Sequence, residues 1–141
     1  MSLDVSNTAP KPSPANLRAA LKDATLRPRD LAQSLGVTEV DLLAAQVGQG
    51  VTRIVAHPDQ LMPVVQGLGE VMALTRNDSV VHERTGTYDD WHSGNHAAMI
   101  LGPEIDLRIF PSHWVHGFAV RNESDKGPSR SLQVFDASGE A

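Results

Sequence analysis

The spacing of apolar residues changes near Gly69, and this change limits the fold more than any other feature. Before Gly69, apolar residues recur every three or four positions, as they do along one face of a helix. After it, apolar and polar residues alternate, as they do in strands with one buried face. Expected helices cover 15–24, 28–35, 38–47 and 59–68. Expected strands cover 70–76, 79–88, 96–102, 105–110, 113–121 and 130–137. The pattern predicts an α+β fold, with three to four helices followed by an antiparallel meander of about six or more strands.

The size and composition of the chain limit its domain organisation and chemistry. With 141 residues, the chain has the length of one domain, expected over 15–141 after a flexible segment at 1–14. A net charge of -5 argues against nucleic acid or an anionic membrane as the main partner. The sequence has no cysteine, which excludes disulfides, iron–sulfur clusters and thiolate-bound haem or zinc. The sequence shows no signal peptide and no apolar run long enough for a membrane span, so we expect a cytoplasmic protein.

A possible helix-turn-helix lies at "RPRDLAQSLGVTEVDLLAA". Pro28 and Gly36 bracket its first helix, and Thr38 with Asp41 forms an imperfect capping box at the start of its second. In a DNA-binding protein this second helix would meet phosphates, which repel the carboxylates of Glu39 and Asp41. We therefore favour a packing corner and keep a DNA-binding regulator as the less favoured alternative. Pro63 is expected near the first turn of the fourth helix, where a missing N–H costs least.

Two histidine pairs have spacings that occur in metal sites. His92 and His96 are four residues apart, but Ser-Gly-Asn between them favours a loop over a zinc-binding helix. His113 and His116, near the start of an expected strand, would point to opposite faces of it. Neither pair is therefore interpreted as a metal site.

His82 is the more informative histidine. In "VVHERTG", alternation places Val80, His82 and Arg84 on one face of the strand. A histidine beside an arginine on one strand face offers an imidazole and a cation to an anionic ligand. The pattern alone nevertheless favours an ordinary strand histidine whose ring is satisfied by a neighbour.

Five segments in order resemble the amino-terminal half of the HemS/ChuS-type bacterial hemin-transport or haem-degrading proteins. They are "RDLAQSLGVTEVDLLAAQVG", "LGEVMALTRNDSVVHERTGTYDD", "NHAAMILGPEIDLRIF", "HWVHGFAV" and "SLQVFDASGE". The resemblance implies one repeat of a two-repeat protein, with haem between the sheet and the helices. It also implies haem supply from an inner-membrane importer and transfer to a haem oxygenase. The family's principal iron ligand belongs to the second repeat, and its position here is taken by Arg84, two residues after His82.

The resemblance indicates a non-covalent haem b site, which requires an iron ligand, apolar walls and cations for the propionates. His82 is the expected metal ligand, with methionine or water opposite. The expected propionate partners are Arg84, Arg76 and Arg108. The expected wall residues are Met72, Met99, Val80, Trp114 and Phe118. For each of these apolar residues, the sequence alone favours an ordinary core position over a haem contact.

The function expected from these features is haem binding and trafficking in bacterial iron acquisition. The main alternative is a haem-degrading enzyme, although no flavin or nicotinamide motif is visible. Because one repeat would leave a sheet surface uncovered, we expect a homodimer or pairing with a second similar repeat.

Overall fold

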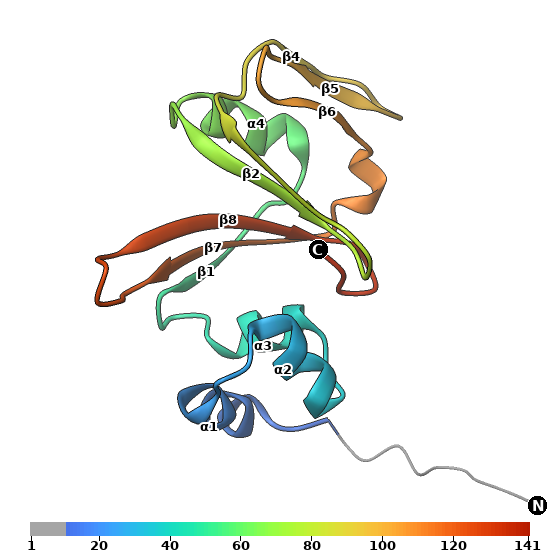
Figure 1. Cartoon of the computed structure of the whole chain (residues 1–141). Helices are drawn as coiled ribbons and strands as arrows, with labels where there is room; N and C mark the ends of the chain where they lie inside the picture. Colours follow the sequence, from blue (N-terminus) through green and yellow to red (C-terminus); the bar gives the residue numbers. More distant parts are fainter. Residues whose placement is uncertain (1–10) are drawn as a thin grey trace, which may run out of the picture.

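A computed structural model describes residues 11–141, in which three helices lie below a sheet and the remaining elements lie above it (Figure 1). Most of the segment predicted to be flexible, residues 1–10, lies outside the described residues. The predicted α+β class is confirmed. Within residues 11–141, no helix combines the length and apolar character needed to cross a membrane.

The lower layer contains α1 (Pro14–Asp23), α2 (Pro28–Leu35) and α3 (Glu39–Ala45). These helices pack around Leu17, Leu31 and Leu42, which are all buried. Gly36 ends α2 with a φ of 68°, a left-handed conformation that glycine adopts without strain. Both hydrogen bonds of the predicted capping box form at α3, so the box is complete.

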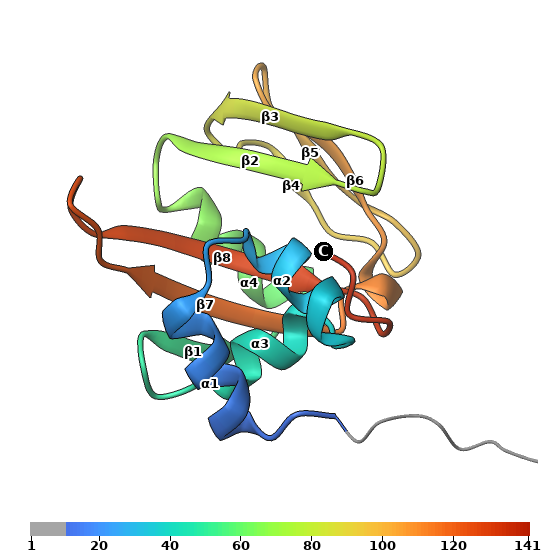
Figure 2. The ribbon, with the colours of Figure 1, turned by 60° about the horizontal axis from the view of Figure 1, so that its bottom comes forward.

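The central sheet has the strand order β1-β7-β8, and both of its strand pairs are antiparallel. Its strands are β1 (Val51–Ile54), β7 (His116–Asn122) and β8 (Ser129–Phe135). Figure 2 shows α1 and α3 in front of this sheet. Phe118 and Phe135 are both buried in the core that the sheet shares with α3, and their ring centroids are 6.1 Å apart. The expectation that all helices precede all strands was wrong, because β1 comes before α4. Four residues between turns are too few to display a strand period.

The helix above the sheet is α4 (Pro58–Gln66), capped at its first residues by the His57 ring, which accepts from the N–H of Asp59. Pro63 is the sixth residue of α4 and so lies just beyond the first turn, near which it was predicted. The helix begins at Pro58, whose fixed φ suits that position. Leu61, Met62 and Val65 face the upper core.

Two smaller sheets complete the upper layer, so the predicted single meander is divided into separate sheets. One is the hairpin of β2 (Val71–Arg76) and β3 (Val81–Gly86). The other contains β4 (Trp91–His92), β5 (Ala98–Leu101) and β6 (Asp106–Ile109). Their shared core with α4 contains Ala73, Ile100 and Ile105. Strand β4 was not predicted, because two residues carry no readable period.

The segment before β7 also differs from the prediction. His113 ends a short 3-10 helix, η1 (Pro111–His113), and β7 begins only at His116. The two histidines therefore do not share a strand, and the expected arrangement on its opposite faces was wrong. Pro111 at the start of η1 favours this turn over an extended strand.

Candidate functional site: an apolar groove with two arginines

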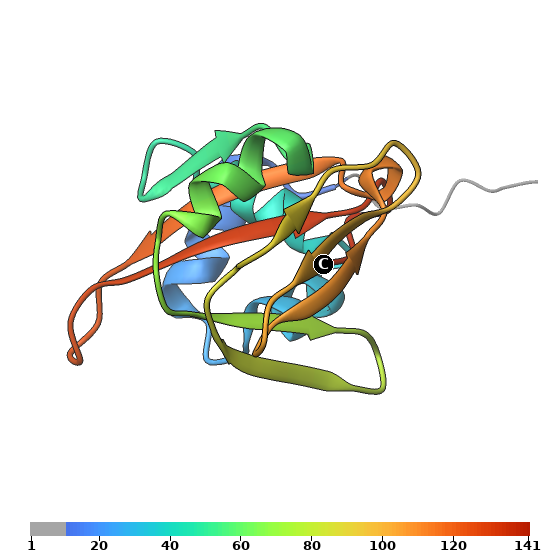
Figure 3. The same ribbon diagram turned by 90° about the horizontal axis from the view of Figure 1, so that it is seen from above.

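A groove of about 730 Å³ lies between α4 and the central sheet. Leu61, Val64 and Leu68 line it from the helical side, and Leu132 and Val134 line it from β8. Val64 and Leu68 remain more than half exposed, at 57% and 54%. Figure 3, viewed from above, shows α4 lying over the strands of this sheet. The groove is large enough for a ligand of several hundred cubic ångströms and has mainly apolar walls.

Three larger side chains contribute to the groove from other segments. Met72 comes from β2, Trp114 follows η1, and Tyr88 follows β3. Burial raises the pKa of the Tyr88 phenol above its ordinary value of 10.0. Tyr88 therefore keeps its proton at neutral pH and can donate a hydrogen bond, but it is a poor source of phenolate.

Arg121 and Arg130 also line the groove and are direct partners in the register of β7 and β8. Like charges directly opposite each other across two strands repel and destabilise the pair. Glu123 offsets part of this charge, because its carboxylate lies 3.1 Å from the Arg121 guanidinium. The remaining positive charge can be balanced by an anionic group, so this end of the groove favours a carboxylate.

The predicted site residues do not converge on this groove. Only Met72 and Trp114 of that set line it. Paired side chains in an antiparallel hairpin share a face, so His82 with Thr75 and Arg84 with Ala73 lie on the face opposite Met72. His82 is exposed and lines neither the groove nor the smaller cleft beside α2.

The other predicted residues have different surroundings. Met99 and Arg108 are register partners on the outer face of the upper sheet, where Arg108 pairs with Asp106 at 3.4 Å. Arg84 forms an ion pair with Glu104. Among the predicted wall residues, Phe118 is completely buried in the core and Val80 is exposed.

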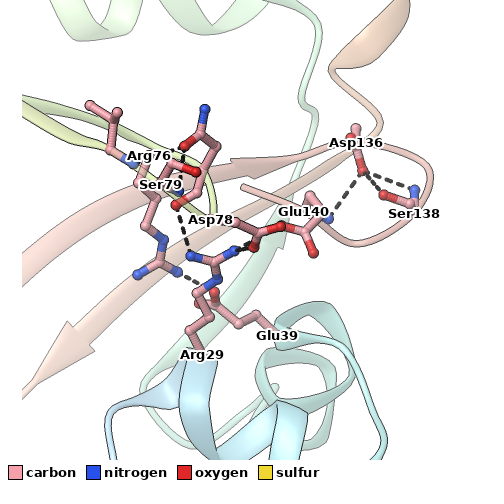
Figure 4. Close-up of polar contacts among 10 residues, drawn as sticks. Arg29, Glu39, Arg76, Asp78, Ser79, Asp136, Ser138 and Glu140 are labelled. Carbon is pink, nitrogen blue, oxygen red and sulfur yellow. Dashed lines mark hydrogen bonds and ion pairs between the residues drawn. The ribbon is translucent and has the colours of Figure 1, made fainter.

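The helix-turn-helix is joined to the rest of the fold by polar contacts (Figure 4). Arg29 of α2 pairs with Asp78 at the tip of the β2–β3 hairpin and lies 3.6 Å from the carboxylate of Glu140. Glu39 of α3 pairs with Arg76. The hydrogen bonds that Asp136 accepts from Ser138 and Glu140 fold the C-terminal turn toward these residues. The motif thus acts as a packing corner in this chain.

The histidines do not form a metal cluster. Within residues 11–141, no group of three or more histidine, cysteine or carboxylate side chains is placed to hold a metal ion. His92 lies in β4 and contacts Asp90 at 2.8 Å, whereas His96 stacks edge-on against Phe110.

Sequence reasoning missed Arg121, Arg130 and Tyr88. A signal for the arginines was present, because Arg121 and Arg130 flank "NESDKGPS", the turn between two expected strands. Residues placed symmetrically about such a turn become cross-strand neighbours. No sequence pattern indicated that Tyr88 would line the groove, because its position depends on the path of the chain after β3.

The fold is an α+β domain with an apolar groove that carries two arginines, and comparison with known proteins identifies the family. Residues 36–141 match the model of the haemin-degrading HemS.ChuX domain. The chain belongs to this family, which confirms the resemblance found in the sequence.

Similar proteins include longer chains. The hemin transport protein HmuS of Yersinia pestis is 38% identical over 114 residues, which cover 80% of this chain and 33% of HmuS. The crystal structure of holo-PhuS, a heme-binding protein from Pseudomonas aeruginosa, is 41% identical with a TM-score of 0.85. The match covers 92% of this chain and 40% of PhuS. ChuS, described as an E. coli heme oxygenase, is 29% identical with a TM-score of 0.83, over 89% of this chain and 39% of ChuS. The chain thus spans about a third of the length of its curated relative HmuS.

Proposed function

We propose that this domain binds haem b non-covalently and takes part in its trafficking in the bacterial cytoplasm. The observation that carries the proposal is the apolar groove with two facing arginines, in a family whose relatives include a hemin transport protein and a heme-binding protein. As the resemblance implies, we propose an inner-membrane haem importer and a haem oxygenase as partners.

The groove residues fit the organic part of haem. The porphyrin is flat and apolar, and it would lie between the α4 side chains and the sheet, with Trp114 at one wall. The two propionates would be bound by Arg121 and Arg130, because guanidinium groups form charge-assisted hydrogen bonds with carboxylates. Such binding offsets the repulsion between these arginines. The site should therefore bind a dicarboxylate more tightly than a neutral ligand of the same shape.

The sequence predicted His82 as the iron ligand, but the candidate ligand inside the groove is Met72. Met72 is 55% exposed, and its thioether is a known type of axial ligand for haem iron. The raised pKa of Tyr88 disfavours a phenolate ligand. Iron ligation by His82 would instead place the iron away from the groove, because His82 is not among the residues that line it. We propose Met72 for haem in the groove, and the two positions are separable by experiment.

Hemin titration followed in the Soret region tests the proposal. Wild type is expected to show a saturable change. Met72→Leu, which conserves volume but removes the sulfur, should alter the spectrum. Arg130→Gln should weaken binding by roughly tenfold, the loss of one charge-assisted bond. His113→Ala, on η1 outside the groove, is the matched control.

The outcomes distinguish the two sites. Loss of the Soret change in His82→Ala, with the groove variants unaffected, would move the haem from the groove to the face of the hairpin that carries His82. No saturable change in wild type would refute haem binding by this domain.

Haem degradation is the second candidate, favoured by the similarity to ChuS. Here the measurement is the Soret band of the hemin complex under ascorbate. Persistence of the band is expected for a trafficking domain. Bleaching with a biliverdin-like product would identify an enzyme.

A further inference from the structure

The groove between α4 and the central sheet offers few of the side chains that hold haem iron. In proteins this iron is bound by histidine, cysteine, methionine or tyrosine. The sequence has no cysteine, and no histidine of residues 11–141 lines the groove. Of these four residue types, the described lining contains two methionines, Met62 and Met72, and one tyrosine, Tyr88.

None of these three side chains is a strong ligand for ferric iron. Met62 is buried and packs in the upper core with Leu61 and Val65. Tyr88 keeps its proton at neutral pH, because burial raises the pKa of its phenol. Met72 is accessible, but its thioether is an uncharged, soft ligand of the kind that selects Cu(I) over harder ions. Iron ligation therefore adds little to the affinity of the groove.

The charged side chains of the groove match the edge of a porphyrin rather than its centre. Arg121 and Arg130 face each other on β7 and β8, where their guanidinium groups can bind two propionates. Glu70 is the one carboxylate among the described lining residues, and it is exposed just before β2 begins. The propionates are present whether or not the ring contains iron. Ferric iron adds a positive charge to the ring, which two arginines do not favour.

The apolar walls respond to the ring and not to its metal. Val64 and Leu68 of α4 and Leu132 of β8 present exposed apolar surface to the groove. Covering such surface stabilises a complex in proportion to the area removed from water. A flat porphyrin covers the same area with or without iron, so this contribution does not depend on the metal.

We propose that the groove recognises the dicarboxylate porphyrin rather than its iron, so that metal-free protoporphyrin IX is a second ligand of this domain. This inference rests on the proposed function and widens its ligand class. It implies that the domain also binds porphyrin that has lost its iron or has not yet received it.

The chain contains one fluorescent reporter suited to both ligands. It has two tryptophans, of which Trp114 lines the groove and Trp91 packs against the upper core. Trp91→Phe leaves Trp114 as the sole tryptophan, and bound porphyrin should quench its fluorescence with or without iron. The comparison uses hemin, protoporphyrin IX, which lacks iron, and hemin dimethyl ester, which lacks free carboxylates. Fluorescence anisotropy of protoporphyrin IX with the wild-type protein gives a second measurement that needs no substitution.

We expect protoporphyrin IX to bind with a dissociation constant within about threefold of that for hemin. Hemin dimethyl ester should bind at least about tenfold more weakly, because its charge-assisted bonds to the arginines are lost. Arg130→Gln should weaken the binding of hemin and protoporphyrin IX alike, whereas Met72→Leu should change neither affinity by more than about threefold. Lys126→Gln, outside the groove lining, is the matched control for loss of a positive charge and should bind both ligands as before.

The outcomes separate this inference from the proposed function. Saturable binding of hemin, with protoporphyrin IX more than about tenfold weaker, would show that iron carries the affinity and would overturn the inference. An effect of Arg130→Gln on hemin alone would place protoporphyrin IX outside the groove and would also overturn it. Binding of neither ligand would instead refute haem binding by this domain.

Discussion

Glu39, in the first turn of α3, forms an ion pair with Arg76 at the end of β2, and its side chain is only 11% exposed. The sequence analysis placed Glu39 in a helix and Arg76 in a later strand, with no indication that the two side chains meet. It places the carboxylate of a would-be recognition helix against the β2–β3 hairpin (Figure 4). The pair therefore connects the helical layer to the upper layer.

Removing one member of this pair should destabilise the fold. Arg76→Ala leaves the Glu39 carboxylate largely buried without its cation, so we expect a loss of about 1–3 kcal/mol in the free energy of unfolding. Urea denaturation measures the loss. Arg108→Ala removes the arginine of the exposed pair with Asp106 and should cost less than about 0.5 kcal/mol. Equal effects of the two variants would contradict a structural role for the Glu39–Arg76 pair.

The α3 capping box should contribute stability that depends on pH. Burial acts to raise the pKa of Asp41, but the hydrogen bond from the Thr38 N–H and the charge of Lys11 outweigh it and lower this pKa below 3.8. A lowered carboxyl pKa stabilises the fold above pH 3.8, and this contribution is lost as the pH falls through the folded-state pKa. Asp41→Asn should remove that part of the pH dependence in unfolding experiments between about pH 2 and 6. An unchanged profile would show that Asp41 does not contribute it.

The other half of the box can be tested at neutral pH. The Thr38 hydroxyl accepts from the N–H of Asp41 at 3.2 Å. Thr38→Ala should therefore cost about 1 kcal/mol, a typical value for losing an N-cap. Thr52→Ala, at an exposed position of β1, is a control for loss of a threonine. Thermal or urea denaturation of both variants gives the comparison.

The chain should not bind duplex DNA. Glu39 and Asp41 occupy the first turn of α3, and Arg29 of the preceding helix is already engaged with Asp78 and Glu140. Fluorescence anisotropy with a labelled duplex at low salt should show no saturable change. Saturable binding that weakens with salt would contradict this expectation, because phosphate contacts release counterions.

The periods in the sequence predicted the helices and most strands, because each of these elements is long enough to display one buried face. Gly36 was predicted to end α2 and Thr38 to cap the start of α3, and both predictions are confirmed. Strands β1 and β4 were missed because their four and two residues show too little alternation.

The candidate site could be predicted only in part, because a groove depends on which elements become neighbours. Met72 and Trp114 were grouped by their size and apolar character, and both line the groove. His82 was grouped with them, but the alternation of β2 and β3 places it on the opposite face. The pairing of Arg121 with Arg130 depends on the register of β7 and β8. The only sign of this register in the sequence is the symmetric placement of the two arginines about the turn.

The facing arginines provide a test in which stability and ligand binding should change in opposite directions. Arg130→Gln removes one of two opposed like charges, so the free energy of unfolding without ligand should rise by about 0.2–1 kcal/mol. The same change should weaken hemin binding, because one propionate loses its cation. The stability gain should shrink in high salt, which screens exposed charges. Lys126→Gln, in the turn between β7 and β8, is the matched control for loss of a nearby positive charge that has no cross-strand arginine. Urea denaturation at low and high salt, combined with hemin titration, measures both effects. A variant that loses stability without ligand would show that Arg121 and Arg130 support the fold rather than a carboxylate site.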